Sequence, residues 1–226
     1  MDLKNFFDYM LIPLRQGELE RLIPAVATGN QFSAASGNPR KILQRIMLSS
    51  IGGVITLLIS QSQVTSQFYS VWLILGVTFL LYILWGPILE ASRKNSKLRN
   101  YPSAALFQGK ILDVFTEELV ENRHEQANKR GELELVENRR TWISLELGDE
   151  DGYLAKLSFP LKQKHQTINI GSTIRCIAFA SNSKFNTINN LSDAWLPQQN
   201  LWVGEYPYLL RPAFEELCYL RITRYK

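Results

Sequence analysis

The chain has 226 residues, of which 46% are hydrophobic and 20% charged, and its formal net charge is +4. The charge is unevenly placed: residues 1–99 contain ten Lys/Arg and five Asp/Glu, whereas residues 100–226 contain fifteen and sixteen. Because nucleic-acid binding depends on neutralising phosphates with Lys and Arg, the slightly acidic C-terminal part is not expected to bind nucleic acid.

Residues 1–40 are predicted to form an N-terminal arm with short amphipathic elements. Apolar residues follow helical spacing in two stretches, but Pro13 and Pro24 interrupt them and exclude long helices. These elements could lie in a membrane interface or pack on a soluble domain, and the sequence leaves both open. Gly29–Arg40 is rich in Gly, Asn, Ser and Ala and is predicted to be a linker.

Two apolar runs, Ile46–Ser60 and Phe68–Leu89, follow with only a short polar connection between them. The second run has 22 residues without a charge. As a helix it would be about 33 Å long, enough for a hydrocarbon core of about 30 Å. Residues 41–92 are therefore predicted to form a transmembrane helical hairpin. Neither run contains a charged residue, which argues against an ion path or a proton relay.

Basic residues gather at both outer ends of this hairpin, and its connecting loop has none. They are Arg40, Lys41, Arg45, Arg93, Lys94, Lys97 and Arg99. By the positive-inside rule, both termini are expected on the cytoplasmic or stromal side.

Small residues recur along one face of the first predicted membrane helix, at spacings of i, i+4, i+7 and i+11. They are Ser49, Gly53, Thr56 and Ser60. Small side chains allow another helix backbone to approach closely in lipid, so this face is predicted to bind a helix. The bound helix is either the second helix of the same hairpin or a helix of a partner protein.

Residues 93–226 are predicted to form a soluble α+β domain. Short stretches between Leu133 and Ala180 alternate in polarity or are rich in β-branched and aromatic residues. About five such strands predict a small β-barrel-like or curled antiparallel sheet. Pro207 is well placed to open a C-terminal helix that continues through Leu220. The expected fold is thus a membrane α-helical hairpin plus an α+β soluble domain.

Four aromatic residues are the strongest candidates for contact with a partner in the predicted soluble domain: Trp195, Trp202, Tyr206 and Tyr208. Trp and Tyr are enriched at protein interfaces, which favours partner binding. The alternative is that these residues cover the sheet or anchor the terminal helix.

No motif predicts catalysis, a cofactor, a metal or a small-molecule substrate. Asp149–Gly152 resembles half of a calcium loop but lacks the distant Glu, and fits a turn better. His124 and His165 do not belong to groups with ligand spacing. Cys176 and Cys218 form no CxxC motif and are expected to be reduced and buried.

Several segments together resemble one known family. They are Leu22–Gly29, Leu84–Ser92, Gly109–Phe115, Gly131–Arg139 and Asn200–Leu209. They are similar to a family of two-helix membrane proteins of cyanobacteria and chloroplasts, whose members are often labelled phosphate transporter permeases. The resemblance spans nearly the whole chain and implies a thylakoid location and a role in photosystem II biogenesis. Two uncharged helices without a substrate site argue against the permease label.

The sequence and the resemblance together predict a thylakoid-membrane auxiliary or assembly factor that acts by contact rather than by catalysis. Its expected partners are membrane lipid and photosystem subunits, or other assembly factors. The alternatives are an accessory membrane subunit of a transporter and a membrane-anchored enzyme of unknown reaction.

Overall fold

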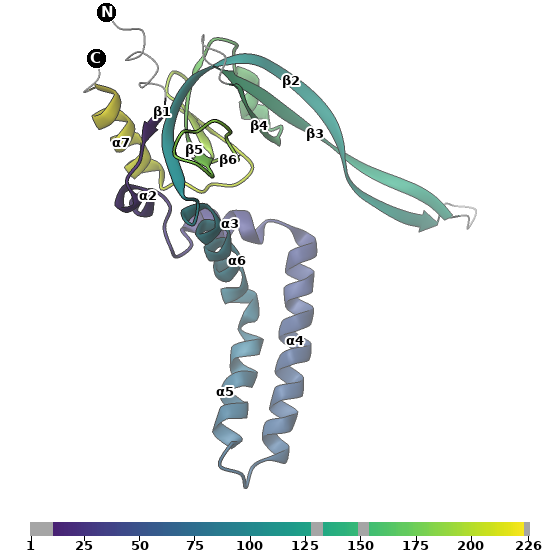
Figure 1. The fold of residues 1–226 in the computed structure, drawn as a ribbon. Coiled ribbons are helices and arrows are strands. Elements are labelled where there is room, and N and C mark those ends of the chain that lie inside the picture. Colours follow the sequence, from purple (N-terminus) through teal and green to yellow (C-terminus); the bar gives the residue numbers. More distant parts are fainter. Residues whose placement is uncertain (1–10, 128–132, 149–153, 224–226) are drawn as a thin grey trace, which may run out of the picture. The chain divides into compact units, whose positions relative to one another are not determined.

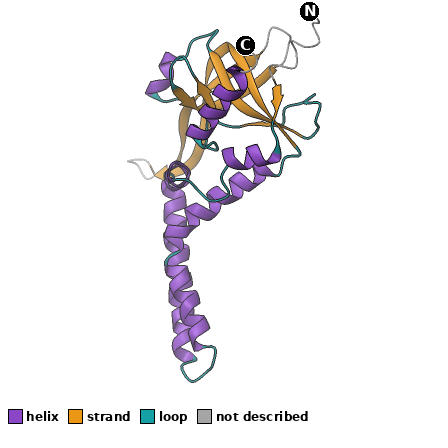
Figure 2. Cartoon of the chain, turned by 90° about the vertical axis from the view of Figure 1, so that its left-hand side faces the viewer, coloured by secondary structure: helices purple, strands orange, loops and turns teal. Residues whose placement is uncertain are grey.

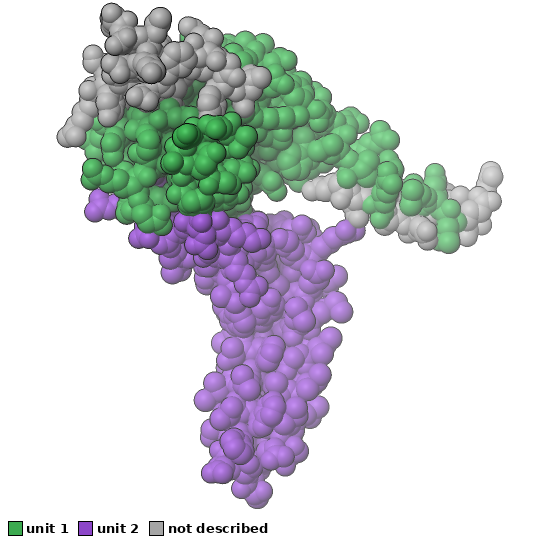
Figure 3. All heavy atoms as spheres, in the orientation of Figure 1, with its two compact units in different colours: residues 1–19, 101–226 green, residues 20–100 purple. Residues whose placement is uncertain are grey.

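The computed structural model describes residues 11–127, 133–148 and 154–223. The chain forms two compact units, one of residues 20–100 and one that combines residues 1–19 with 101–226 (Figure 3). The first is helical, and the second contains the strands and one terminal helix (Figure 2). These limits differ from the expected boundaries at residues 40 and 92, because helices on both sides of those boundaries belong to the helical unit.

The helical unit contains α3 (Gly29–Ser36), α4 (Pro39–Ser62), α5 (Tyr69–Leu80) and α6 (Tyr82–Arg99). A preceding helix, α2 (Gln16–Leu22), crosses from one unit to the other along the sequence.

The linker predicted for residues 29–40 is wrong, because most of it is helix α3. Thr28 and Gln31 form a capping box: the Gln31 amide donates to Thr28 Oγ1 at 3.4 Å, and the Thr28 amide donates to Gln31 Oε1 at 3.1 Å. This arrangement satisfies two amides that the first helical turn cannot pair. The Thr-x-x-Gln spacing was visible in the sequence, but the small residues around it favoured a linker.

A buried amide pair fixes α3 to α6. Gln31 Nε2 donates to Asn95 Oδ1 at 3.2 Å, and Asn95 Nδ2 donates to Gln31 Oε1 at 2.9 Å. Asn95 Nδ2 also donates to the Pro24 carbonyl at 2.9 Å. Both side chains are fully buried, so their amide groups need hydrogen-bond partners within the protein. The pair therefore holds the turn before α3 against α6.

Helix α4 is long, and α5 returns beside it after the connection at residues 63–68 (Figure 1). Asn38 caps α4 by accepting from the Arg40 amide at 3.0 Å, and Pro39 occupies the first turn, where it has no hydrogen bond to lose. With 24 residues, α4 is about 36 Å long.

The second apolar run is not one continuous helix, and this expectation is corrected. It breaks at Leu81 into α5 and α6, whose axes differ by 74°. With 12 residues, α5 is only about 18 Å long, too short to cross a bilayer without α6.

The other unit is built on an antiparallel sheet (Figure 1). Its strands are β1 (Leu11–Pro13), β2 (Ser103–Ala127), β3 (Leu133–Gly148), β4 (Leu154–Pro160), β5 (Thr173–Ala180), β6 (Asn190–Leu191), β7 (Ala194–Leu196) and β8 (Leu201–Val203). A short 3₁₀ helix, η1 (Gln163–Thr167), follows β4, and α7 (Arg211–Thr223) ends the described chain. The predicted α+β fold with a C-terminal helix is confirmed.

The strands follow the order β4-β3-β2-β5-β7-β8, with β1 beside β2 and β6 beside β5. Within the described residues this path has two ends, β4 and β8, so the sheet is not closed. Of the two forms that the sequence left open, a barrel-like or a curled sheet, the barrel-like one is wrong. One core cluster lies on one face of the sheet and includes Phe107, Leu145, Phe159, Ile174 and Cys176, all at most 1% exposed. Leu106, Ile177 and Phe179, which alternate to the other face, are also fully buried. Strand β1 packs on the sheet through β2, whereas the preceding residues 1–10 lie outside the described residues.

Strands β2 and β3 continue far beyond this core as a two-stranded β-arm, residues 118–127 paired with 133–141 (Figure 1). Strand β5 borders β2 only up to Lys110, and β4 borders β3 only from Trp142. Over the described length of the β-arm, neither outer edge therefore pairs with a further strand. Isolated two-stranded ribbons are marginally stable in water, and open edges readily accept another chain.

Candidate membrane and partner interface

Most of the exposed large apolar side chains of the described chain lie on α4, α5 and the first half of α6. Leu43, Leu58 and Ile74 are each at least 60% exposed. Apolar surface of this extent is unusual on a monomeric soluble protein and is typical of a surface that contacts a membrane or another protein. Within the described residues, α4 alone has the length and composition to cross a membrane, and the bent α5–α6 pair is a second candidate only if it counts as one span.

The small-residue face of α4 is directed at α5. Ser49, Thr56 and Ser60 are at most 8% exposed, and Gly53 is also buried. A Cβ at Gly53 would lie 2.5 Å from Leu80 Cδ2, and one at Gly76 of α5 would lie 3.1 Å from Thr56 Oγ1. Helix α5 therefore occupies this face. Binding of a partner protein to these four residues remains a prediction.

Side chains satisfy the carbonyl groups that the break at Leu81 releases. In an unbroken helix the Thr78 and Leu80 carbonyls would accept from amides four residues later. Instead, Trp85 Nε1 donates to the Thr78 carbonyl at 2.9 Å, and Ser49 Oγ donates to the Leu80 carbonyl at 2.5 Å. The Leu81 amide bonds back to the carbonyls of Val77 and Phe79. The break is thus compatible with an environment that offers no water.

Substituting Ser49 and Gly53 together with Ile is expected to destabilise the packing of α4 against α5. The change removes the donor to the Leu80 carbonyl and forces the Leu80 side chain aside, at a cost of about 2–4 kcal/mol. The measurement is unfolding of the detergent-solubilised full chain by titration with a denaturing detergent. Ser50→Ile, on the exposed face of α4, is the matched control. An equal loss in both variants would contradict the assignment of the small-residue face to α5.

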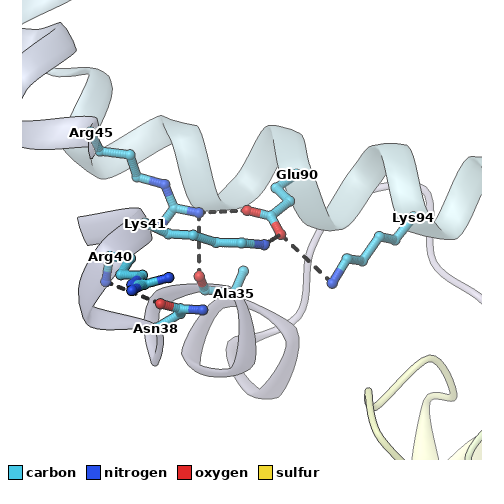
Figure 4. Close-up of polar contacts among 7 residues, drawn as sticks. All are labelled: Ala35, Asn38, Arg40, Lys41, Arg45, Glu90 and Lys94. Carbon is cyan, nitrogen blue, oxygen red and sulfur yellow. Dashed lines mark hydrogen bonds and ion pairs between the residues drawn. The ribbon is translucent and has the colours of Figure 1, made fainter. Parts of the chain in front are cut away.

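An ionic cluster lies where α4 begins and α6 leaves its apolar part (Figure 4). The Glu90 carboxylate accepts from Lys41 and from Arg45 Nη2, the latter at 2.7 Å, and lies 3.6 Å from Lys94 Nζ. Arg45 Nη2 also donates to the Ala35 carbonyl at 3.2 Å. The Arg45 side chain is only 7% exposed, so its charge depends on Glu90 for compensation.

The four predicted contact aromatics lie on β7, β8 and the segment before α7. Trp195 and Trp202 face each other across β7 and β8, with ring centroids 6.4 Å apart. Trp202 also contacts Phe214 of α7 and donates from Nε1 to Glu215 at 3.1 Å. Tyr206 contacts Tyr208, with ring centroids 4.8 Å apart. Trp202 and Tyr206 are buried, so neither side chain offers an open contact surface, and Trp202 attaches α7 to the sheet.

A family model for a family of unknown function (DUF8619) matches residues 12–221, nearly the whole chain. The chain belongs to this family. No curated protein and no solved structure matches it.

This DUF8619 chain also contains a buried carboxyl group that sequence reasoning missed. Asp193, between β6 and β7, is 4% exposed; its Oδ1 accepts from the Leu209 amide at 2.9 Å. Gly204, with φ of 145°, passes so close that a Cβ there would lie 2.9 Å from Asp193 Cβ. Burial raises the pKa of Asp193 to about 7, while the Leu209 amide and the nearby Arg211 charge act in the opposite direction. Asp193 therefore joins the strands to the segment before α7.

The remaining candidate chemical groups have structural surroundings. His165 is buried in η1, where it accepts from the Lys162 amide at 3.1 Å and contacts Phe159. Burial, together with Lys164 and Lys162, lowers its pKa to about 4. Cys176 and Cys218 are buried free thiols, as expected. Burial raises the pKa values of both thiols. Among the described residues, no group of three potential metal ligands occurs; Asp149–Gly152 and the His124 side chain lie outside that description.

Proposed function

We propose that this protein is an auxiliary factor of the thylakoid membrane that binds photosystem subunits, in particular those of photosystem II, during assembly. Helix α4 and the α5–α6 pair anchor it in the bilayer, with both termini on the cytoplasmic or stromal side. It acts by holding and covering its client and not by catalysis.

The main support for a membrane location is the exposed apolar surface of α4 and α5. Only 22% of the most apolar 18-residue window of α4 is buried inside the structure, unlike the core helix of a soluble protein. Basic residues follow directly where this surface ends, as at the cytoplasmic side of membrane helices. The satisfied carbonyls of Thr78 and Leu80 support the same location, because lipid offers them no partner.

The β-arm is the strongest candidate for contact with the client outside the membrane. It has two open edges along its described length, and Leu119, Leu133 and Leu135 are 45–73% exposed. A client segment that adds as a further strand would satisfy the edge amides and cover these side chains. The photosystem as client rests on the resemblance of the five sequence segments given above.

Affinity isolation of the tagged full chain from photosynthetic membranes tests this proposal. Wild type is expected to recover photosystem subunits. A variant with residues 119–140 replaced by Asn-Gly joins Glu118 to Thr141, which already pair across the two strands, through a favoured two-residue turn. Recovery should fall by about tenfold or more, because the variant lacks most of the β-arm.

The same variant should unfold within about 1 kcal/mol of wild type, because the core ends at Val114 and Ile143 and the deleted part lies beyond it. The deleted residues include five basic and five acidic side chains, so the variant keeps the net charge of wild type. Undiminished recovery with the short arm would exclude the β-arm as the contact. Recovery of an ATPase and a permease in place of photosystem subunits would favour a transporter accessory subunit.

A further inference from the structure

Six cations and one carboxylate form a basic rim where the apolar surface of the helical unit ends. They are Arg40, Lys41, Arg45, Arg93, Lys94, Lys97 and Glu90. On α6, Glu90, Lys94 and Lys97 follow at i, i+4 and i+7, so they share one helix face with Arg93. Lys41 and Arg45 bring the start of α4 to the same face by binding Glu90 (Figure 4).

The single carboxylate leaves most of this charge uncompensated. Glu90 engages Lys41, Arg45 and Lys94. The side chains of Arg40, Arg93 and Lys97 are exposed, and the described part of the chain places no carboxylate in an ion pair with them. The positive end of the α4 dipole adds to the field at Arg40. The rim therefore consists of three exposed cations, Arg40, Arg93 and Lys97, and of the cluster around Glu90, whose net charge is also positive.

Apolar side chains border the rim on both helices. Leu43 and Ile46 follow it on α4, and Ile88 and Leu89 precede it on α6, each 38–60% exposed. A ligand that matches this surface carries a negative charge at one end and apolar chains at the other. A free anion would use only the cations, and a zwitterionic lipid would gain little from them.

We propose that the basic rim binds the phosphate headgroup of an anionic phospholipid in the leaflet that faces the termini, while the lipid's acyl chains lie along α4 and α6. This inference rests on the proposed membrane location. The lipid site adds a specific partner to that location. The depth of the protein in the membrane would then depend on the headgroup charge as well as on the length of its apolar helices.

Native mass spectrometry of the full chain in a neutral detergent, titrated with phosphatidylglycerol or phosphatidylcholine, tests the inference. Wild type is expected to bind phosphatidylglycerol preferentially. The triple variant R40Q/R93Q/K97Q should bind it about 10- to 100-fold more weakly, because each cation near an anionic headgroup contributes about a fivefold factor. The matched control, K162Q/K164Q/K184Q, removes the same charge from exposed positions of the other unit and should bind as wild type does.

Equal binding of the two lipids, or equal affinity of the triple variant and wild type, would overturn the inference. Competition by inorganic phosphate at millimolar concentration would also overturn it, because the site would then recognise a free anion. Extraction of native membranes with alkaline carbonate reports separately on the membrane location. A protein that resists extraction but shows no lipid preference refutes the lipid site alone, whereas a readily extracted protein refutes the anchor.

Discussion

In wild type, Asp193 is expected to lower the free energy of unfolding as the pH rises from about 4 to about 7. Asp193→Asn is expected to remove most of this decrease. Burial between the strands and the segment before α7 raises the pKa of this carboxyl group from 3.8 to about 7. Between these values the folded protein retains a proton that the unfolded chain has released. The stabilisation is therefore complete below pH 3.8 and disappears as the pH rises through about 7.

The size of this effect follows from the difference between the two pKa values. Their separation corresponds to about 4 kcal/mol, at about 1.4 kcal/mol per unit, which is a large fraction of the stability of an ordinary domain. The Asn side chain cannot ionise, yet its carbonyl oxygen can still accept from the Leu209 amide. Asp193→Ala removes that acceptor as well and should be less stable than Asp193→Asn at every pH.

Denaturant unfolding of the full chain in mild detergent, at several pH values between 4 and 8, measures the effect. His165 provides the opposing control. Its pKa falls from 6.5 to about 4, so its contribution is present above pH 6.5 and is lost as the pH falls through about 4. With Asp193→Asn the stability should therefore rise with pH, and with His165→Gln it should fall. Identical pH profiles for Asp193→Asn and wild type would show that Asp193 does not titrate in this range.

The sequence predicted the elements whose patterns are local. The C-terminal helix, the apolar helix within residues 39–62 and the approach of a second helix to its small-residue face all follow from spacing along one segment. Strand β2 was missed because its apolar and charged residues do not alternate strictly, and two irregularities in its pairing with β3 shift the register. From Ile111 to Ala127, β2 pairs with β3 alone, a partner that comes later in the sequence.

Contacts between distant residues account for the other errors. Nothing in the apolar sequence around Leu81 marks a helix break, because the groups that stabilise it are Ser49, on another helix, and Trp85, one turn beyond the break. Asp193 likewise follows a short polar stretch and resembles an ordinary turn residue in the sequence. Its burial depends on Leu209 and Gly204, which the fold brings together.

Glu90→Ala is expected to destabilise the helical unit by about 2–3 kcal/mol. The substitution leaves the Arg45 guanidinium, whose side chain is 7% exposed, without its carboxylate, with the Ala35 carbonyl as its remaining hydrogen-bond partner in the cluster. Loss of one partner from a buried ion pair is costly because the other charge stays buried and uncompensated. Glu90 itself is 25% exposed, so the expected cost lies below that of a fully buried pair.

Unfolding of the solubilised full chain by a denaturing detergent measures this cost, with Glu20→Ala as the matched control. Glu20 lies 3.5 Å from Arg99 in the same unit, but its side chain is 49% exposed, so its loss should cost no more than about 0.5 kcal/mol. The double variant R45M/E90A removes the buried charge together with its partner and should recover much of the lost stability. If R45M/E90A is no more stable than Glu90→Ala, an unpaired Arg45 is not the cause.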